Sequence, residues 1–145
     1  MSRRARGRRD SSAQPRENVM AEKGIRMLRR LLGDERAQEA RAAWAKLSPD
    51  FADLVTNFLA GKIWSRPHLD LKTRSLVTVA ALTALGRPNG LRLNIEIALN
   101  NGATQEEILE TLLQMAPYAG FPACWEGLVI ADEVFEHKRT AAKSL

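Results

Sequence analysis

The stretch LKTRSLVTVAALTAL, residues 71–85, decides the fold class because it is apolar on almost every side after its first turn. Few residues of the chain combine strong β-propensity with alternation, and Gly86 follows the stretch as a helix-ending residue. A helix of this kind must be surrounded by protein. A chain of 145 residues has few other helices to surround it, so we expect a homo-oligomer.

Helical signals continue on both sides of this stretch. Ser48-Pro49-Asp50 is typical of a helix start, with Ser48 as N-cap and Pro49 at the first helical position. Thr104-Gln105-Glu106-Glu107 forms a capping box. Apolar residues at helical spacing predict seven short helices, at about residues 22–32, 34–46, 49–63, 71–85, 89–100, 105–116 and 122–139. The sequence therefore predicts a single-domain, all-α protein.

The net charge of +5 is concentrated at the N-terminus. Residues 1–17 contain six arginines against Asp10 and Glu17, a charge of +4, so the rest of the chain carries +1. No aromatic residue is interleaved with these arginines, so we do not expect a nucleic-acid partner. We predict a disordered leader at residues 1–19, with Met20 as an alternative start, a helical domain at 20–140, and a C-terminal tail at 141–145.

Composition excludes several classes of protein. No run of about 18 apolar residues is present, so we expect no membrane-spanning helix. Cys124 is the only cysteine, which rules out an intramolecular disulfide, and His68 and His137 lie far apart without ligand-like spacing. We therefore expect no metal site and a location in the reducing cytoplasm.

Six short motifs occur in a fixed order between about Gly24 and Lys138. They are LGD (residues 32–34), IWSRP (63–67), TRSLVTVA (73–80), ALNNGAT (98–104), YAGFPA (118–123) and ADEVF (131–135). Their order and spacing resemble the carboxymuconolactone decarboxylase family. The resemblance implies a helical fold of the alkylhydroperoxidase D kind, assembly as trimers or hexamers, and cofactor-free chemistry on a small organic acid or lactone.

The chain departs from this family at its titratable positions. Members usually have Glu and, four residues later, His before the Asn-Asn-Gly motif, where this chain has Gly90 and Asn94. The namesake enzymes tend to have a His in the last helix, where Val129 stands, and the peroxidase branch needs a second cysteine beside Cys124. Decarboxylation, isomerisation or related proton transfer on another small acid or lactone is our leading hypothesis. The alternatives are a noncatalytic oligomeric binding or scaffold protein and, behind it, a thiol peroxidase.

Three residues are candidates for catalysis. Asn94 falls on the inward face of its predicted helix, where an amide can orient a substrate or tie helices together but cannot shuttle protons. Glu126 is the acid nearest to the Gly-Phe-Pro turn and a candidate general acid or base, with solvated surface as the alternative. His68 is the imidazole expected nearest to a site.

Five residues are candidates for substrate binding. Arg74 can clamp a substrate carboxylate, or make an internal salt bridge or a contact between subunits. Cys124 is either a small core residue or a thiol activated by a helix start. Trp64, Tyr118 and Phe121 either wall an aromatic pocket or pack in the ordinary way.

Overall fold

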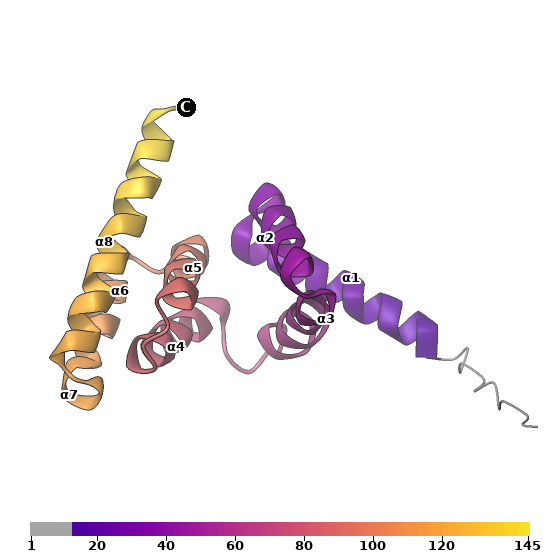
Figure 1. Ribbon diagram of the computed structural model, residues 1–145, viewed down its shortest axis with the longest axis horizontal. Coiled ribbons are helices and arrows are strands. Elements are labelled where there is room, and N and C mark those ends of the chain that lie inside the picture. The colour runs from indigo at the N-terminus through magenta and orange to yellow at the C-terminus, as the bar shows by residue number, and fades with distance from the viewer. Residues whose placement is uncertain (1–12) are drawn as a thin grey trace, which may run out of the picture. The chain divides into compact units, whose positions relative to one another are not determined.

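A computed structural model describes residues 13–145, and every regular element in this part of the chain is a helix (Figure 1). In chain order the elements are α1 (Ala13–Leu32), α2 (Asp34–Leu47), α3 (Pro49–Asp53), η1 (Leu54–Trp64), α4 (Leu71–Ala84), α5 (Pro88–Asn100), α6 (Gln105–Gln114), α7 (Ala116–Ala119) and α8 (Phe121–Lys143). The all-α prediction is confirmed. No helix within residues 13–145 is long and apolar enough to cross a membrane.

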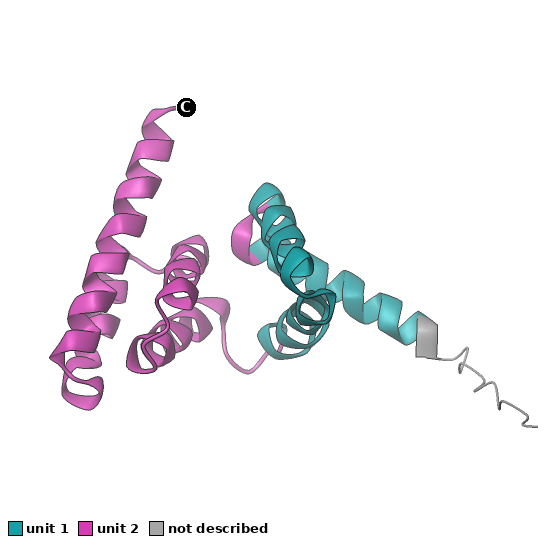
Figure 2. Ribbon diagram, viewed as in Figure 1, with its two compact units in different colours: residues 1–30, 34–65 teal, residues 31–33, 66–145 magenta. Residues whose placement is uncertain are grey.

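The described residues group into two compact units, and the single domain expected from the sequence stays a prediction (Figure 2). The first comprises residues 13–30 and 34–65, and the second comprises residues 31–33 and 66–145. One boundary falls between Ser65 and Arg66, in the irregular residues between η1 and α4, and the last two residues of α1, Leu31 and Leu32, are grouped with the second unit.

The terminal helices are longer than the sequence predicted. Helix α1 begins at Ala13, so residues 13–19 belong to a helix and not to a disordered leader, and residues 1–12 lie outside the described part. Helix α8 continues through Thr140 to Lys143, so most of the predicted C-terminal tail is helical. Both extensions contain good helix formers such as Ala, Glu and Lys, whose propensity the apolar spacing did not reveal.

The helix expected at residues 49–63 starts as predicted but changes its hydrogen-bonding pattern. Ser48 accepts a hydrogen bond from the Phe51 backbone N–H at 3.2 Å, and Pro49 occupies the first turn of α3. From Leu54 to Trp64 the chain forms the π-helix η1. Apolar spacing over so short a segment does not distinguish a π-helix from an α-helix, so the sequence did not predict the change.

The second unit is built around α4, α5, α6 and α8. Its buried core contains Val79, Leu91, Ile95, Ala98, Ala103, Ile108, Leu112, Ile130, Ala131, Val134 and Phe135. Helix α4 turns Ser75, Val79 and Thr83 inward, and both hydroxyls donate to carbonyls of their own helix. On its opposite face Val77 is exposed, and so is Leu85 directly after the helix, so the packing of the described second unit leaves this side of α4 uncovered.

The Asn-Asn-Gly motif has a structural role in the second unit. The Asn100 amide donates to the Leu31 carbonyl at 2.8 Å, and the Asn101 amide donates to Ser75 Oγ at 2.8 Å. Gly102 has φ of 90°, a left-handed conformation that favours glycine after a helix end. The motif therefore fixes the end of α5 to α4 and to residues 31–33.

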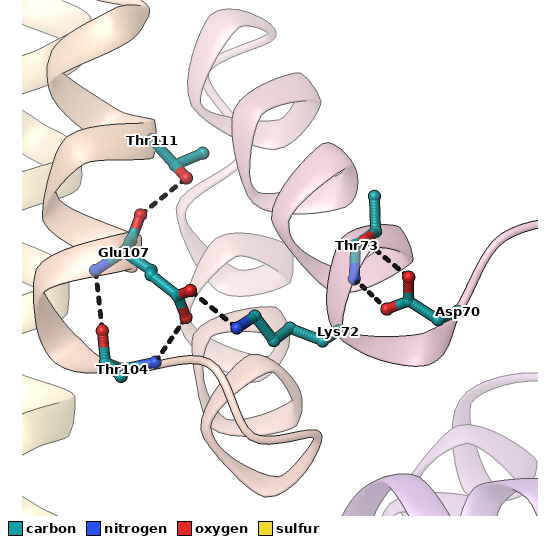
Figure 3. A network of polar contacts seen from close by, with 6 residues as sticks. All are labelled: Asp70, Lys72, Thr73, Thr104, Glu107 and Thr111. Atoms are coloured by element: carbon teal, nitrogen blue, oxygen red, sulfur yellow. Dashed lines mark hydrogen bonds and ion pairs between the residues drawn. The ribbon is translucent and has the colours of Figure 1, made fainter.

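Figure 3 shows the polar contacts that cap α4 and α6. Asp70 accepts hydrogen bonds from the backbone N–H and the hydroxyl of Thr73, both at 2.8 Å, and these bonds lower the pKa of Asp70. The predicted capping box between Thr104 and Glu107 is present, and Lys72 Nζ lies 2.6 Å from Glu107 Oε1. The hydrogen bond from Lys72, followed by that from Thr104, lowers the pKa of Glu107.

We expect the charge of Glu107 to stabilise the second unit only above acid pH. Its pKa lies below the ordinary value of 4.5 in the folded chain, so its contribution is present above that value and is lost as pH falls through the folded pKa. Glu107→Gln keeps an acceptor for the capping box but removes the charge. Its melting temperature should therefore fall below that of wild type at pH 7, and the gap should close at low pH.

The matched control for this experiment is Glu106→Gln. Glu106 is exposed in the same first turn of α6, so its substitution should change the melting temperature little at any pH. If the difference in melting temperature between Glu107→Gln and wild type stayed constant from pH 7 to acid pH, the charge of Glu107 would not be the source of the stabilisation.

Candidate functional site

A groove in the second unit lies where α5 and α8 pack together, with a volume of about 550 Å³. Its wall is mostly apolar, and its lining residues are Pro88, Pro122, Trp125, Glu126, Val129 and Ile130. Trp125 is 71% exposed and Val129 is 46% exposed, so both present apolar surface to the groove opening. A volume of this order accommodates a small organic molecule.

The first turns of two helices contribute to this groove. Pro88 begins α5 and Pro122 begins α8, each within the first two helical positions. Neither helix start has a side-chain cap: Arg87 and Gly120 occupy the capping positions without a capping hydrogen bond. Pro88 and Pro122 have no N–H of their own, so the unpaired backbone donors of these first turns belong to the residues that follow them, and their partial positive charge favours an anionic group.

Glu126 is the one titratable side chain among the residues that line the groove. Within the described chain no hydrogen bond or ion pair involves its carboxylate, and the residue is exposed. It therefore has its full hydrogen-bonding capacity available to a molecule bound there. Val129, where the family resemblance led us to expect a histidine, lines the same groove one turn further along α8.

Asn94 does not line the groove, and its amide is turned toward its own helix. It is half-buried on α5, and its Nδ2 donates to the Gly90 carbonyl at 2.9 Å. A Cβ atom built on Gly90 would meet the Leu82 methyl groups at 3.5 Å, which is ordinary van der Waals contact. Gly90 is therefore not required by close packing.

Arg74 makes an internal contact, to backbone carbonyls rather than to an acid. Its Nη2 donates to the carbonyl oxygens of Arg66 at 3.2 Å and Leu69 at 3.4 Å, so it holds the segment that precedes α4. His68 lies in this segment and is exposed, and it does not line the groove. The Arg74 Nε atom is buried without a hydrogen-bond partner in the described residues.

The remaining candidates are divided between core and surface. Cys124 is buried on α8 and behaves as a core residue, and Trp64 is buried at the end of η1 in the first unit. Tyr118 and Phe121 are more than three-quarters exposed, on either side of the turn that leads into α8. Neither is a lining residue of the groove, so the aromatic pocket that we considered is represented there by Trp125 alone.

A second cleft between α5 and α8, with mostly charged residues among those that line it, was not predicted. Its volume is about 350 Å³, and it is lined by Arg92, Glu96, Glu133, Val134, His137 and Lys138. Arg92 and Glu133 form an ion pair, and Lys138 donates to Asn100 Oδ1 at 2.6 Å. Burial lowers the pKa of Lys138, and the charge of Glu96 opposes this effect.

The sequence contains a signal for this cleft. Arg92 and Glu96 lie four positions apart on α5, and Glu133 and His137 lie four positions apart on α8, which is the spacing of side chains on one helix face. Among residues 13–145 no three His, Cys, Asp or Glu side chains are placed to hold a metal ion.

Comparison with known proteins identifies the family. The model of the carboxymuconolactone decarboxylase family matches residues 49–133. The 4-carboxymuconolactone decarboxylase of Acinetobacter baylyi is 37% identical over 113 residues, which cover 78% of this chain and 84% of that protein. The nitrosuccinic acid decarboxylase of Metarhizium robertsii is 32% identical over 114 residues, covering 77% and 78%. An uncharacterized 15.0 kDa protein of Paracoccus denitrificans is 41% identical over 96 residues, covering 64% and 71%.

The chain therefore belongs to the carboxymuconolactone decarboxylase family, as its motifs indicated. Two of these relatives are named as decarboxylases of organic acids.

Proposed function

We propose that this protein is a cofactor-independent decarboxylase, or a related proton-transfer enzyme, that acts on a small organic acid or lactone in the groove between α5 and α8. The groove carries the proposal because it combines an apolar wall, two uncapped helix starts and one carboxyl group. The names of two relatives support the substrate class. The namesake reaction is not proposed, since the positions of the family's Glu and two His are occupied by Gly90, Asn94 and Val129.

The chemistry requires an electron acceptor in the substrate. When the bond to the carboxylate carbon breaks, its electron pair moves into a neighbouring acceptor such as a nitro group or an unsaturated lactone, and carbon dioxide leaves. A proton must then reach the carbon that lost the carboxylate, or a position conjugated with it. The protein has to bind the anion, keep water away and deliver this proton.

We assign each of these three roles to a different part of the groove. Backbone N–H groups in the first turns of α5 and α8 hold a substrate carboxylate that is not lost. Trp125, Val129 and Ile130 cover the apolar body of the substrate. Glu126 passes the proton to the carbon that lost the carboxylate, and water replaces that proton.

The test is turnover of small acids that carry an activating group next to the carboxylate, with nitrosuccinate as the first probe. We expect wild type to release carbon dioxide from at least one such acid, with deuterium entering the product in heavy water. Glu126→Gln should lower kcat by about 10²- to 10⁴-fold, the usual range for a general acid, and change KM little. Carbon dioxide release and product NMR measure both quantities.

Glu106→Gln is the control, because this exposed acid of α6 is not a lining residue of the groove. It should keep wild-type kcat. A wild type without turnover of any activated acid would favour the noncatalytic binding protein instead. Equal turnover by wild type and Glu126→Gln would remove Glu126 from the mechanism.

The expected homo-oligomer, a trimer or hexamer, also belongs to this proposal. Exposed apolar residues on α4 (Val77, Leu85) and on α8 (Trp125, Val129) support it, since soluble proteins seldom leave large apolar faces uncovered. In such an assembly a neighbouring copy would also restrict the access of water to the groove.

A further inference from the structure

The first unit carries a row of exposed apolar side chains on α3 and η1. Phe51, Leu54 and Phe58 are each half exposed or more, and they follow one another at spacings of three and four residues. Side chains at these spacings lie on one side of a helix, and the wider turn of a π-helix keeps residues four apart on nearly the same side. We call these three residues the first-unit stripe.

A second row of exposed apolar side chains lies on α8, in the second unit. Phe121, Trp125 and Val129 follow one another at spacings of four residues, and all three are exposed. We call them the α8 stripe. Trp125 and Val129 also line the groove of the candidate site, so a surface that covers the α8 stripe also closes the groove.

The area of each stripe matches the apolar centre of an interface between proteins. An aromatic side chain buries about 150–250 Å² when it is fully covered. The members of the stripes are roughly half to three-quarters exposed, so each stripe offers on the order of 300–400 Å². One partner of a standard interface contributes about 800 Å², with an apolar centre and a polar rim. Charged residues beside the stripes therefore have to form the rim.

The charged residues of α3 and η1 differ between the two ends of the first-unit stripe. Asp50 and Asp53 belong to α3, beside Phe51, and Lys62 lies in η1, where it lines one cleft together with Phe58. All three charged residues are exposed, and none of their side chains has a hydrogen bond or ion pair within the described chain. The stripe is therefore negative at its α3 end and positive at its η1 end.

The α8 stripe has the opposite distribution of charge. Arg87 directly precedes Pro88, which lines the groove together with Pro122 at the start of α8. Glu126 and Asp132 lie further along α8. Arg87, Glu126 and Asp132 are exposed, and their side chains form no hydrogen bond or ion pair with the described residues. This stripe is therefore positive at its first end and negative at its second.

We propose that the first-unit stripe of a second copy of this chain covers the α8 stripe and closes the groove. The two stripes lie side by side and run in the same direction. Lys62 of one copy then lies near Asp132 of the other, and Asp50 lies near Arg87. The contact between copies stands without the proposed function, but its role in completing a catalytic groove rests on that function.

The register of the two stripes supports this pairing. Lys62 follows Phe51 by eleven residues, and Asp132 follows Phe121 by the same number. When the first members of the two stripes are side by side, the positive end of one therefore meets the negative end of the other. Complementary charges of this kind fix the register of an interface.

Pairing between unlike stripes is favoured over pairing of the α8 stripe with itself. Two α8 stripes related by a twofold axis would bring two copies of Glu126 together beside Trp125, at the centre of the contact. Like charges across an interface are unfavourable. One contact between unlike stripes covers both apolar rows and repeats from copy to copy into a closed ring. The neighbouring copy then supplies the missing wall of the groove.

The experiment is sedimentation velocity on the full chain and its variants, with helicity checked by circular dichroism. Wild type should associate at micromolar concentration, and Leu54→Ser and Trp125→Ser should each weaken association about tenfold or more, because both truncate a central apolar residue. Val19→Ser is the matched control, since Val19 is 63% exposed like Leu54 but lies on α1, outside both stripes. It should associate as wild type does.

Mixing the two weakened variants identifies what covers the α8 stripe. The Leu54→Ser chain keeps an intact α8 stripe, and the Trp125→Ser chain keeps an intact first-unit stripe, so one wild-type contact can form between them. We expect dimers in the equal mixture at a concentration at which each variant alone is a monomer. No gain on mixing would mean that each stripe pairs with itself or with another partner. That result, a monomeric wild type, or equal association of Leu54→Ser and Val19→Ser would overturn the proposal.

Lys62→Glu tests the direction of the stripes. It places like charges near Asp132, so association should weaken several-fold, and the added substitution Asp132→Lys should restore it. Lys143→Glu, in the last turn of α8, is the control and should have little effect. Stronger association of Lys62→Glu would overturn the parallel arrangement. Every readout is association, so a failure here is distinct from an absence of turnover, which would count against the proposed function alone.

Discussion

Replacing Gly24 by alanine is expected to unfold the first compact unit at a clearly lower urea concentration than in wild type. The added Cβ would lie 1.9 Å from the carbonyl oxygen of Thr56, a distance that real Cβ atoms do not show. The atom that it meets belongs to the backbone of η1, so a change of side-chain rotamer cannot relieve the clash. Helix α1 would have to move away from η1.

Two effects of opposite sign decide the size of the change. Alanine is favoured over glycine by about 1 kcal/mol in a helix interior. Overpacking typically costs about 1–3 kcal/mol and more where the backbone must shift, so the clash should outweigh the propensity. We expect a net loss of about 2 kcal/mol in the free energy of unfolding of the first unit.

The matched control is the same substitution at another helical glycine. Gly90→Ala places its Cβ 3.5 Å from the Leu82 methyl groups, so only the favourable propensity remains. Tryptophan fluorescence in a Trp125→Phe background reports on Trp44 and Trp64 alone, both in the first unit. Equal urea midpoints for Gly24→Ala and wild type would show that α1 and η1 do not cross as described.

Local signals in the sequence predicted local structure well. Ser48 and Thr104 cap α3 and α6 as expected, because a capping residue acts on backbone groups only two or three positions away. The start of α1 at Ala13 was missed because no apolar stripe marks the beginning of this helix, and residues 15–19 are exposed. The close approach of Gly24 to Thr56 depends on residues far apart in the sequence, and one sequence alone gives no measure of that distance.

The candidate site was also predicted only in part, because it depends on residues that are far apart in the sequence. Glu126 was named from its position near the Gly-Phe-Pro turn, and the structure places it in the groove. Asn94 was placed on an inward face, but a helical wheel does not show that its amide bonds to Gly90 of the same helix. The contribution of Pro88 was not foreseen, since it requires the start of α5 to lie beside α8.

The double substitution Gly90→Glu with Asn94→His is expected to give this protein activity on 4-carboxymuconolactone that wild type lacks. In wild type the amide of Asn94 donates to the Gly90 carbonyl, and an amide cannot give or take a proton near neutral pH. A histidine at position 94 titrates near pH 7, and a glutamate one turn earlier can accept its ring N–H and fix its tautomer. A Cβ at Gly90 would make ordinary contact with the Leu82 methyl groups, so the first atom of the new side chain fits without a clash.

The size and pH dependence of the gain identify the imidazole as its source. General acid catalysis contributes about 10²- to 10⁴-fold, so we expect turnover at least about 10² above the wild-type background, measured by carbon dioxide release. Because the protonated imidazole is the acid, kcat should fall as pH rises above the histidine pKa. Gly90→Glu with Asn94→Gln is the matched control, since it adds the carboxylate without the imidazole, and it should stay inactive.

Substantial turnover of 4-carboxymuconolactone by wild type would contradict the loss of the proton donor from α5. Another residue would then have to donate the proton. Glu126 would be substituted first and His68 second, because Glu126 lines the groove that a substrate can enter.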